Sequence, residues 1–195
     1  MNEVLETIQT RRSIRRYTGE QIPEEILQEI ITAGLYAPGA GGRQSGIMVV
    51  CQEREINDAL GRANRGAFGA PGAASAFRVS TEQPSIADDP NIPSAFYGAP
   101  TVISLFAPRG MVNGPGDCWC MGENMLLAAH ALGIGSCVVA RATSTFEGEL
   151  GQRLLVEWGV PENYEPILHV VMGYRDGAAP HDKPRREGRV IRVQA

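Results

Sequence analysis

The sequence predicts one α+β domain in which helices flank a sheet, as in a three-layer sandwich. Helix and strand patterns are interspersed along the chain, and the four or five strand patterns are all short. The length of 195 residues suits one domain, and an apolar content of 43% is enough for a sizeable core. We therefore treat residues 1–195 as a single domain.

The first part of the chain predicts two helices, a strand and a third helix. Residues 3–10 have the pattern of a short helix with one apolar side. Pro23 opens a second helix at a position that tolerates proline, and Pro38 ends it. The apolar residues of this helix recur at spacings of three and four: Ile26, Ile30, Ala33 and Ala37. The run Ile47–Cys51 predicts a buried strand, and residues 54–63 predict a polar amphipathic helix.

Residues 64–97 lack a regular pattern and carry many glycines and prolines, so we expect loops with one short helix after Asn91. A segment of this length without regular structure often covers or lines a site. Thr101–Phe106 predicts the second strand. Asp117 is expected to be the N-cap of the strongest helix, which runs to about Leu132.

That helix, residues 117–132, is apolar on nearly every side, which predicts burial in the core or at a subunit interface. Two further strands, Ser136–Ala140 and Ile167–Met172, flank a helix near residues 146–158. Val190–Val193 predicts a last short strand after a polar tail that contains two prolines.

Composition narrows the classes of function. A net charge of −4 and a pI of about 5.4 argue against nucleic acid as the main partner, because a phosphate backbone requires a broadly positive face. We expect no signal peptide and no membrane span, because the chain has no apolar run of the required length. Four cysteines have neither the density of a disulfide scaffold nor a zinc spacing, which predicts reduced thiols in a cytoplasmic protein: Cys51, Cys118, Cys120 and Cys137.

Two basic clusters lie at opposite ends of this acidic chain, Arg11–Arg16 and Lys183–Arg186. Charge of this density repels itself unless an anion satisfies it, and arginine offers a rigid fork of donors that suits a phosphate. Charge alone leaves two interpretations open. The two ends grip one phosphate between them, or each cluster is a solvated surface run.

Hydrolytic chemistry is poorly supported. The chain has no Gly-x-Ser-x-Gly elbow, and neither a Rossmann nor a P-loop glycine pattern. Of its three histidines, we expect His130 and His169 to be structural and His181 to be solvated, and they show no metal-ligand spacing. A chain that is poor in acid–base groups but able to hold an anion suggests that a bound cofactor supplies the reactivity.

Several stretches, in order along the chain, resemble the nitroreductase family. They are Arg11–Tyr17 (RRSIRRY), a helix ending in Ala37-Pro38, Gly42-Arg43-Gln44 before a strand, Ala99-Pro100 before another, Leu126–Ser136 (LLAAHALGIGS), Met172-Gly173-Tyr174 and Lys183-Pro184-Arg185. Each match is short, but together they span nearly the whole chain. The resemblance implies a central, mostly antiparallel sheet flanked by helices.

The resemblance also implies a function. Family members are flavoproteins that bind FMN, usually at the interface of an intertwined homodimer. The implied reaction passes hydride from NAD(P)H through flavin N5 to a nitroaromatic, a quinone or a similar small-molecule electron acceptor in a ping-pong cycle. It implies no catalytic side chain, because the flavin carries the chemistry. The residues implied to bind the cofactor are Arg11, Arg12, Ser13, Arg15, Pro38, Gly39, Ala40, Gly42, Gln44, Val139, Ala140, Arg141, Lys183 and Arg185.

Within this set, the resemblance assigns different parts of FMN to different stretches. Residues 11–13, with Lys183 and Arg185, match the grip on the ribityl and phosphate groups. Arg15 matches a cation near the N1/O2 edge, where reduced flavin carries negative charge that a guanidinium stabilises. Val139–Arg141 matches the backbone that passes N5.

The chain departs from the family pattern where glycine replaces serine at position 39 and asparagine at position 42. Two outcomes stay open: each lost side-chain hydrogen bond weakens cofactor binding by roughly 1 kcal/mol, or the glycine-rich loop brings its backbone N–H groups closer to the ring instead. Gly39 and Gly42 therefore leave an alternative open, a flavin-binding protein of the same fold with little or no turnover. The resemblance further implies that residues 174–195 form a C-terminal arm exchanged in a homodimer.

Overall fold

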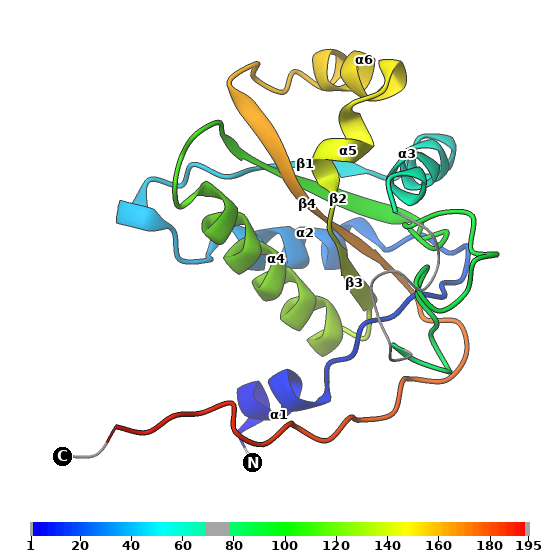
Figure 1. Ribbon diagram of the computed structural model, residues 1–195, viewed down its shortest axis with the longest axis vertical. Coiled ribbons are helices and arrows are strands. Elements are labelled where there is room, and N and C mark those ends of the chain that lie inside the picture. Colours follow the sequence, from blue (N-terminus) through cyan, green and yellow to red (C-terminus); the bar gives the residue numbers. More distant parts are fainter. Residues whose placement is uncertain (1, 69–78, 194–195) are drawn as a thin grey trace.

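The computed structural model describes residues 2–68 and 79–193. Its middle layer is a four-stranded sheet in the order β1-β2-β4-β3, in which every pair of neighbours is antiparallel (Figure 1). The strands are β1 (Ile47–Cys51), β2 (Thr101–Pro108), β3 (Gly135–Val139) and β4 (Tyr164–Gly173). This sheet confirms the α+β fold and its antiparallel centre.

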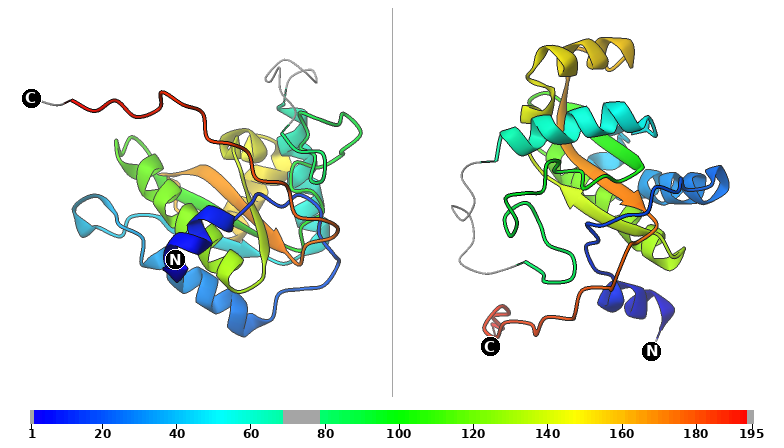
Figure 2. Two further views of the ribbon diagram at one scale, coloured as in Figure 1. Left: turned by 90° about the horizontal axis from the view of Figure 1, so that it is seen from below. Right: turned by 90° about the vertical axis from the view of Figure 1, so that its right-hand side faces the viewer.

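Helices cover both faces of the sheet (Figures 1 and 2). On one face α2 (Glu24–Leu35) packs against α4 (Gly114–Ala131), and the other face carries α3 (Arg54–Gly66), α5 (Ala142–Phe146) and α6 (Glu149–Glu157). Alternate residues of β4 serve the two cores, because successive side chains of a strand point to opposite faces. Leu168, Val170 and Met172 join the α2–α4 core, and Val171 joins the other core. The short helix α1 (Glu3–Thr10) lies outside, against α4.

The long apolar helix begins earlier than the sequence predicts. α4 starts at Gly114, with Pro115 in its first turn, where a missing N–H has no consequence. Asp117 is therefore not the N-cap. Its carboxylate instead accepts a hydrogen bond from the backbone N–H of Ala40, at 3.0 Å.

Three other expectations were wrong. The helix expected near residues 146–158 is two helices, α5 and α6, which meet at Gly148. The short helix expected directly after Asn91 does not form, and residues 91–98 contain turns instead. Within the described part of the tail, Val190–Val193 is not a strand.

From residue 79 onward, side-chain hydrogen bonds hold the turns of the irregular segment. The Asp88 carboxylate accepts hydrogen bonds from the backbone N–H groups of Val79, at 2.7 Å, and Ser85, at 2.8 Å. Gln83 lies fully buried below this turn. Residues 69–78, which belong to the same expected loop, lie outside the described part of the chain.

Candidate functional site

The two basic clusters meet. Residues 11–15 leave the end of α1 and cross the edge of the sheet, where Ile14 donates a backbone hydrogen bond to Ser136 of β3, at 2.9 Å. The C-terminal tail returns to the same place after β4 (Figure 2). Together they surround a cavity of about 210 Å³, which is lined by Arg11, Arg12, Ser13, Arg15, Val79, Ser80, Pro180, His181, Asp182, Lys183 and Arg185.

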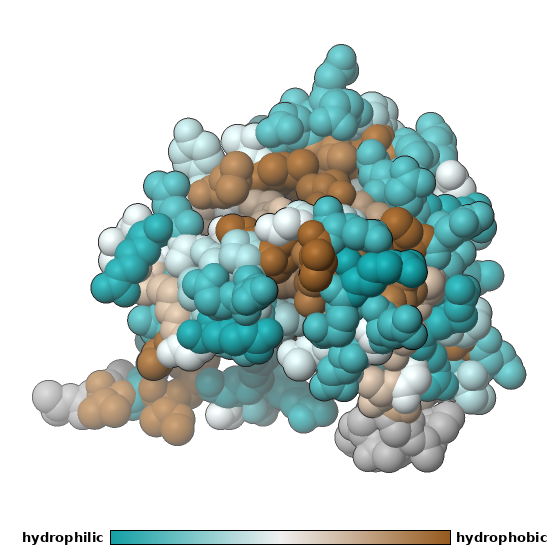
Figure 3. All heavy atoms as spheres, turned by 90° about the horizontal axis from the view of Figure 1, so that it is seen from above, coloured by the Kyte–Doolittle hydropathy of each residue, from teal (hydrophilic) through white to brown (hydrophobic). Residues whose placement is uncertain are grey.

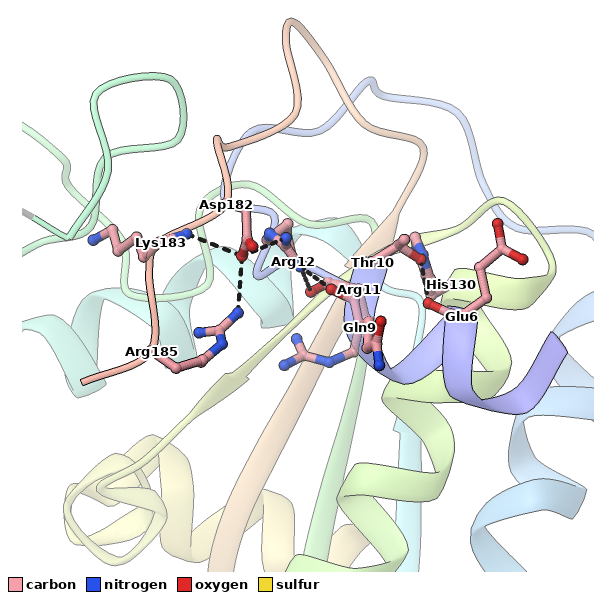
Figure 4. Close-up of polar contacts among 9 residues, drawn as sticks. All are labelled: Glu6, Gln9, Thr10, Arg11, Arg12, His130, Asp182, Lys183 and Arg185. Atoms are coloured by element: carbon pink, nitrogen blue, oxygen red, sulfur yellow. Dashed lines mark hydrogen bonds and ion pairs between the residues drawn. The ribbon is translucent and has the colours of Figure 1, made fainter. Parts of the chain in front are cut away.

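One carboxylate oxygen, Oδ1 of Asp182, collects donors from both clusters (Figure 4). Nη2 of Arg12 lies 2.6 Å from it, Nη2 of Arg185 lies 2.8 Å away, and the backbone N–H of Lys183 donates to it at 2.9 Å. Three donors around one anionic oxygen form the arrangement that a phosphate oxygen also requires. Asp182 therefore marks an anion-binding position between the two ends of the chain.

The Arg11 guanidinium has an unused hydrogen-bond donor that could bind a further anion. Its Nε atom is buried and has no hydrogen-bond partner among the described residues, and the nearest carboxylate oxygen paired with it, on Glu123, is 3.9 Å away. A buried donor without a partner is unfavourable. A phosphate held in the cavity would supply the acceptor that this guanidinium lacks, so the residues present fit such a group.

Gln83 forms hydrogen bonds with both the N-terminal segment and the C-terminal tail. Its Oε1 accepts a hydrogen bond from the backbone N–H of Arg15, at 2.8 Å, and its Nε2 donates to the carbonyls of Asp176, at 3.0 Å, and Ala178, at 3.3 Å. The Arg15 guanidinium also donates to the Gln83 carbonyl, at 3.3 Å. The position of the Arg15 side chain is thereby set by a residue from the irregular segment.

The tail has a second anchor beside the cavity. Hydrogen bonds from its own backbone and from Ser80 lower the pKa of Glu82 to about 2, and this carboxylate lies 2.6 Å from Nδ1 of His181. The Lys183 ammonium also donates to the carbonyl of Val79. The tail as far as Arg185 is thus held on its own chain.

The loop that contains the other expected cofactor residues lies elsewhere. Pro38, Gly39, Gly42 and Gln44 line a different cavity, of about 440 Å³, beside the first turns of α4, and Ala40 is held there by Asp117. This cavity and the basic cavity share no lining residue. The described chain therefore does not bring this loop to its own basic clusters.

The third expected group, Val139–Arg141, forms the end of β3 and the turn into α5. Arg141 has a φ of +63°, which L-residues other than asparagine rarely adopt. Asn64 of α3 holds this turn, because its Nδ2 donates to the carbonyls of Ala140, at 2.8 Å, and Arg141, at 3.3 Å. In return the Arg141 guanidinium donates to Oδ1 of Asn64, at 3.0 Å, and lies over the ring of Phe68.

The histidines do not form a centre of their own. Burial lowers the pKa of His169 to about 3, so it is neutral, and burial together with Arg11, Arg12 and Arg175 lowers the pKa of His130. Among the described residues, no histidines, cysteines and carboxylates group in a way that could hold a metal ion. No helix in the described ranges is long and apolar enough to cross a membrane.

Sequence reasoning missed four residues that shape the site. Asp182 directly precedes the second basic cluster, and this acidic residue beside basic ones was the available sign of an ion pair. Gln83 and Asn64 gave no signal, because a buried amide is recognised only once its partners are known. Asp117 was assigned as a helix cap because its residue type suits that position, so its hydrogen bond to the loop at Ala40 was not predicted.

Comparisons with known proteins identify relatives of this chain in both sequence and structure. A family model described as "Nitroreductase family" matches residues 8–174. The chain is similar to a nitroreductase from Bacteroides fragilis solved with bound FMN, at 30% identity, full coverage of both chains and a TM-score of 0.80. It is 31% identical, over 89% of its length and 86% of the relative's, to an Archaeoglobus fulgidus protein provisionally named NADH dehydrogenase/NAD(P)H nitroreductase. It is 28% identical to an NADPH-flavin oxidoreductase from Vibrio harveyi, over 98% of this chain and 73% of that protein.

Proposed function

The chain belongs to the nitroreductase family, and on that premise we propose that it is an FMN-dependent oxidoreductase that uses NAD(P)H as reductant. The acceptor would be a nitroaromatic, a quinone or a similar small molecule, which binds after the oxidised nicotinamide has left. When bound, FMN supplies the redox chemistry by accepting hydride at N5 and passing electrons on to the acceptor. The work would take place in the cytoplasm, where NADH and NADPH are available.

The observation that carries this proposal is the meeting of the two basic clusters at one carboxylate oxygen. Donors from Arg12, Lys183 and Arg185 already converge on a single anionic position, and the buried Nε of Arg11 has no hydrogen-bond partner in the described part of the chain. These groups would hold the terminal phosphate of FMN. The absence of a dinucleotide glycine pattern in the sequence favours FMN over FAD.

Two further groups would act on the flavin ring. Arg15, fixed by Gln83, would place its guanidinium at the N1/O2 edge and favour the reduced cofactor. The backbone at Val139–Arg141 would border N5. No side-chain base is needed for a hydride transfer, which agrees with a neutral His169 sealed in the core.

We propose that the working form is a homodimer in which each site draws on both chains. The loop that holds Gly39 and Gly42 lies apart from the basic cavity of its own chain, so a second copy would supply it. The tail beyond Arg185 carries apolar side chains that are largely exposed: Val190 (76%), Ile191 (89%) and Val193 (95%). Figure 3 shows apolar atoms on the segment that projects at lower left. An arm exchanged with the partner would bury them.

One observation favours the alternative of a flavin-binding protein with little turnover. Gly42 has no side chain where the family pattern has an asparagine, and because an added Cβ there would meet no atom within 4 Å, no neighbouring group takes its place. Loose contact on one side of the ring would lower the affinity for the cofactor without abolishing the phosphate grip.

The first experiment is the absorbance spectrum of the purified protein and identification of the flavin that heat releases from it. We expect FMN. FAD as the dominant species, or a colourless protein that does not take up FMN, would contradict the proposal. Anaerobic addition of NADH or NADPH then separates the two readings, because an enzyme bleaches and is reoxidised by an added quinone, whereas a flavin carrier stays yellow.

A further inference from the structure

A line of four buried polar side chains leads from the middle of the sheet to the turn at Arg141. Oγ of Ser104 on β2 lies 2.8 Å from Nδ1 of His169 on β4, and Nε2 of His169 lies 3.1 Å from Oγ1 of Thr145 on α5. Nδ2 of Asn64 donates to the same Thr145 hydroxyl, at 2.8 Å. All four residues are at most 3% exposed. An apolar core with four polar side chains needs every one of them satisfied.

The hydrogens in this line can be assigned by counting. The Thr145 hydroxyl has one hydrogen, and it donates that hydrogen to the carbonyl of Arg141, at 3.1 Å. It must therefore accept from its two other neighbours, the Asn64 amide and His169. His169 is thus neutral with its hydrogen on Nε2, and its Nδ1 accepts from the Ser104 hydroxyl. From Ser104 through His169 and Thr145, each donor in the line therefore points toward the carbonyl of Arg141.

This direction matters because the turn is conformationally unfavourable. A left-handed backbone conformation is unfavourable for a residue other than glycine and persists only where its surroundings fix it. At Arg141 the fixing groups are named: the Thr145 hydroxyl and the Asn64 amide hold the carbonyls of residues 140 and 141. The rest of the line holds Thr145.

We propose that Thr145, with its hydroxyl oriented by His169, is a positioning residue. It fixes the left-handed turn at Arg141 and thereby sets how the backbone of residues 139–141 faces the flavin ring. This inference rests on the proposed function. It goes further, because it assigns the geometry at the reacting edge of the cofactor to a buried hydroxyl that lies behind the backbone and does not touch the flavin.

The test is Thr145→Val, which keeps the shape of the side chain and removes the hydroxyl, compared with Thr145→Ser, which keeps the hydroxyl. We expect the valine variant to bind FMN within about threefold of the wild-type Kd, because the phosphate grip is untouched. Its visible flavin absorbance bands should shift, and its rate constant for reduction by NADH or NADPH should fall at least about tenfold, since small misplacements of a reacting group have large effects on rate. The serine variant should restore both properties.

Thr101→Val is the matched control. Thr101 is equally buried, and its hydroxyl is hydrogen-bonded to Gln21 and Gln52 at the opposite end of β2 from Pro108. A similar loss of thermal stability with an unchanged flavin spectrum and reduction rate is expected for it. Should Thr145→Val fail to fold, Thr145→Ala removes the same hydroxyl and carries the same expectation.

A Thr145→Val protein with the wild-type spectrum and reduction rate, and only a lower Tm, would overturn the inference and make the line a structural feature of the core. A wild-type protein that takes up no FMN would instead overturn the proposed function. The spectrum of the wild-type protein therefore tells the two failures apart.

Discussion

Arg12 and Asp182 form an ion pair at 2.6 Å that joins the two ends of the chain across the mouth of the basic cavity. The oxygen that Arg12 contacts is the same one that Arg185 and the backbone of Lys183 contact. An internal carboxylate thus occupies the position that the proposed function gives to a phosphate.

Replacing this carboxylate is expected to strengthen cofactor binding. A phosphate must displace Asp182 from its charged partners, and Asp182→Asn leaves a neutral group that holds them less strongly. We expect the Kd for FMN to fall by about tenfold, measured by quenching of flavin fluorescence. Riboflavin, which lacks the phosphate, should bind both proteins equally. Weaker FMN binding by the variant would mean that Asp182 assembles the site.

The two basic clusters should act on one group. Arg11→Ala and Arg185→Ala are each expected to weaken FMN binding by about 1.5–3 kcal/mol, the range of charge-assisted hydrogen bonds. The double variant should lose much less than the sum, because both residues serve the same phosphate. Arg153→Ala, on the exposed side of α6, is the control. Strictly additive losses would show that the two arginines bind separate groups.

Shortening the tail tests the proposed arm. A chain that ends at Gly188 lacks the exposed residues Val190, Ile191 and Val193 but keeps Asp182, Lys183 and Arg185. Light scattering should show a dimer for the full chain and a weakened or absent dimer after truncation, with FMN lost in parallel. An intact chain that is monomeric and still yellow would rule out a site shared between subunits.

The glycine loop can be tested by restoring the family residue. Gly42 has a φ of +63° and open space where a Cβ would lie, and asparagine tolerates this conformation better than other side chains. Gly42→Asn should tighten FMN binding by up to about 1 kcal/mol through one added hydrogen bond. Gly41→Asn, at the same φ, serves as the control. Equal effects of the two substitutions would indicate a general change in the loop.

His169 should make the stability of the fold depend on pH. Burial lowers its pKa from 6.5 to about 3, so between these values the unfolded chain takes up a proton that the folded chain does not. The contribution of His169 to the free energy of unfolding is therefore complete above pH 6.5. It declines as the pH falls below this value, by about 1.4 kcal/mol per pH unit. In urea unfolding at pH 7.5, 6.5 and 5.5, the gap between wild type and His169→Gln should narrow with acid. A constant gap would contradict the assignment.

The sequence predicted the elements that depend on local patterns and missed those that depend on distant partners. The strands near β1 and β2 were found from their apolar runs, and α2 from its spacing and prolines. The start of α4 was misplaced because aspartate is a common N-cap residue, whereas the Asp117 carboxylate accepts a hydrogen bond from Ala40 in a distant loop. Likewise, the convergence of the basic clusters was an inference from a resemblance, whereas Gln83, which enforces it, lies in a segment without any pattern.

The order of strands in the sheet has a consequence for synthesis on the ribosome. β4 is the last strand to be made, yet it lies inside the sheet, where it pairs with both β2 and β3. Until Gly173 has emerged, β3 has no strand to pair with, and the apolar sides of α4 have only part of their core. Until translation is almost complete, the nascent chain therefore exposes apolar surface that its own last strand later covers.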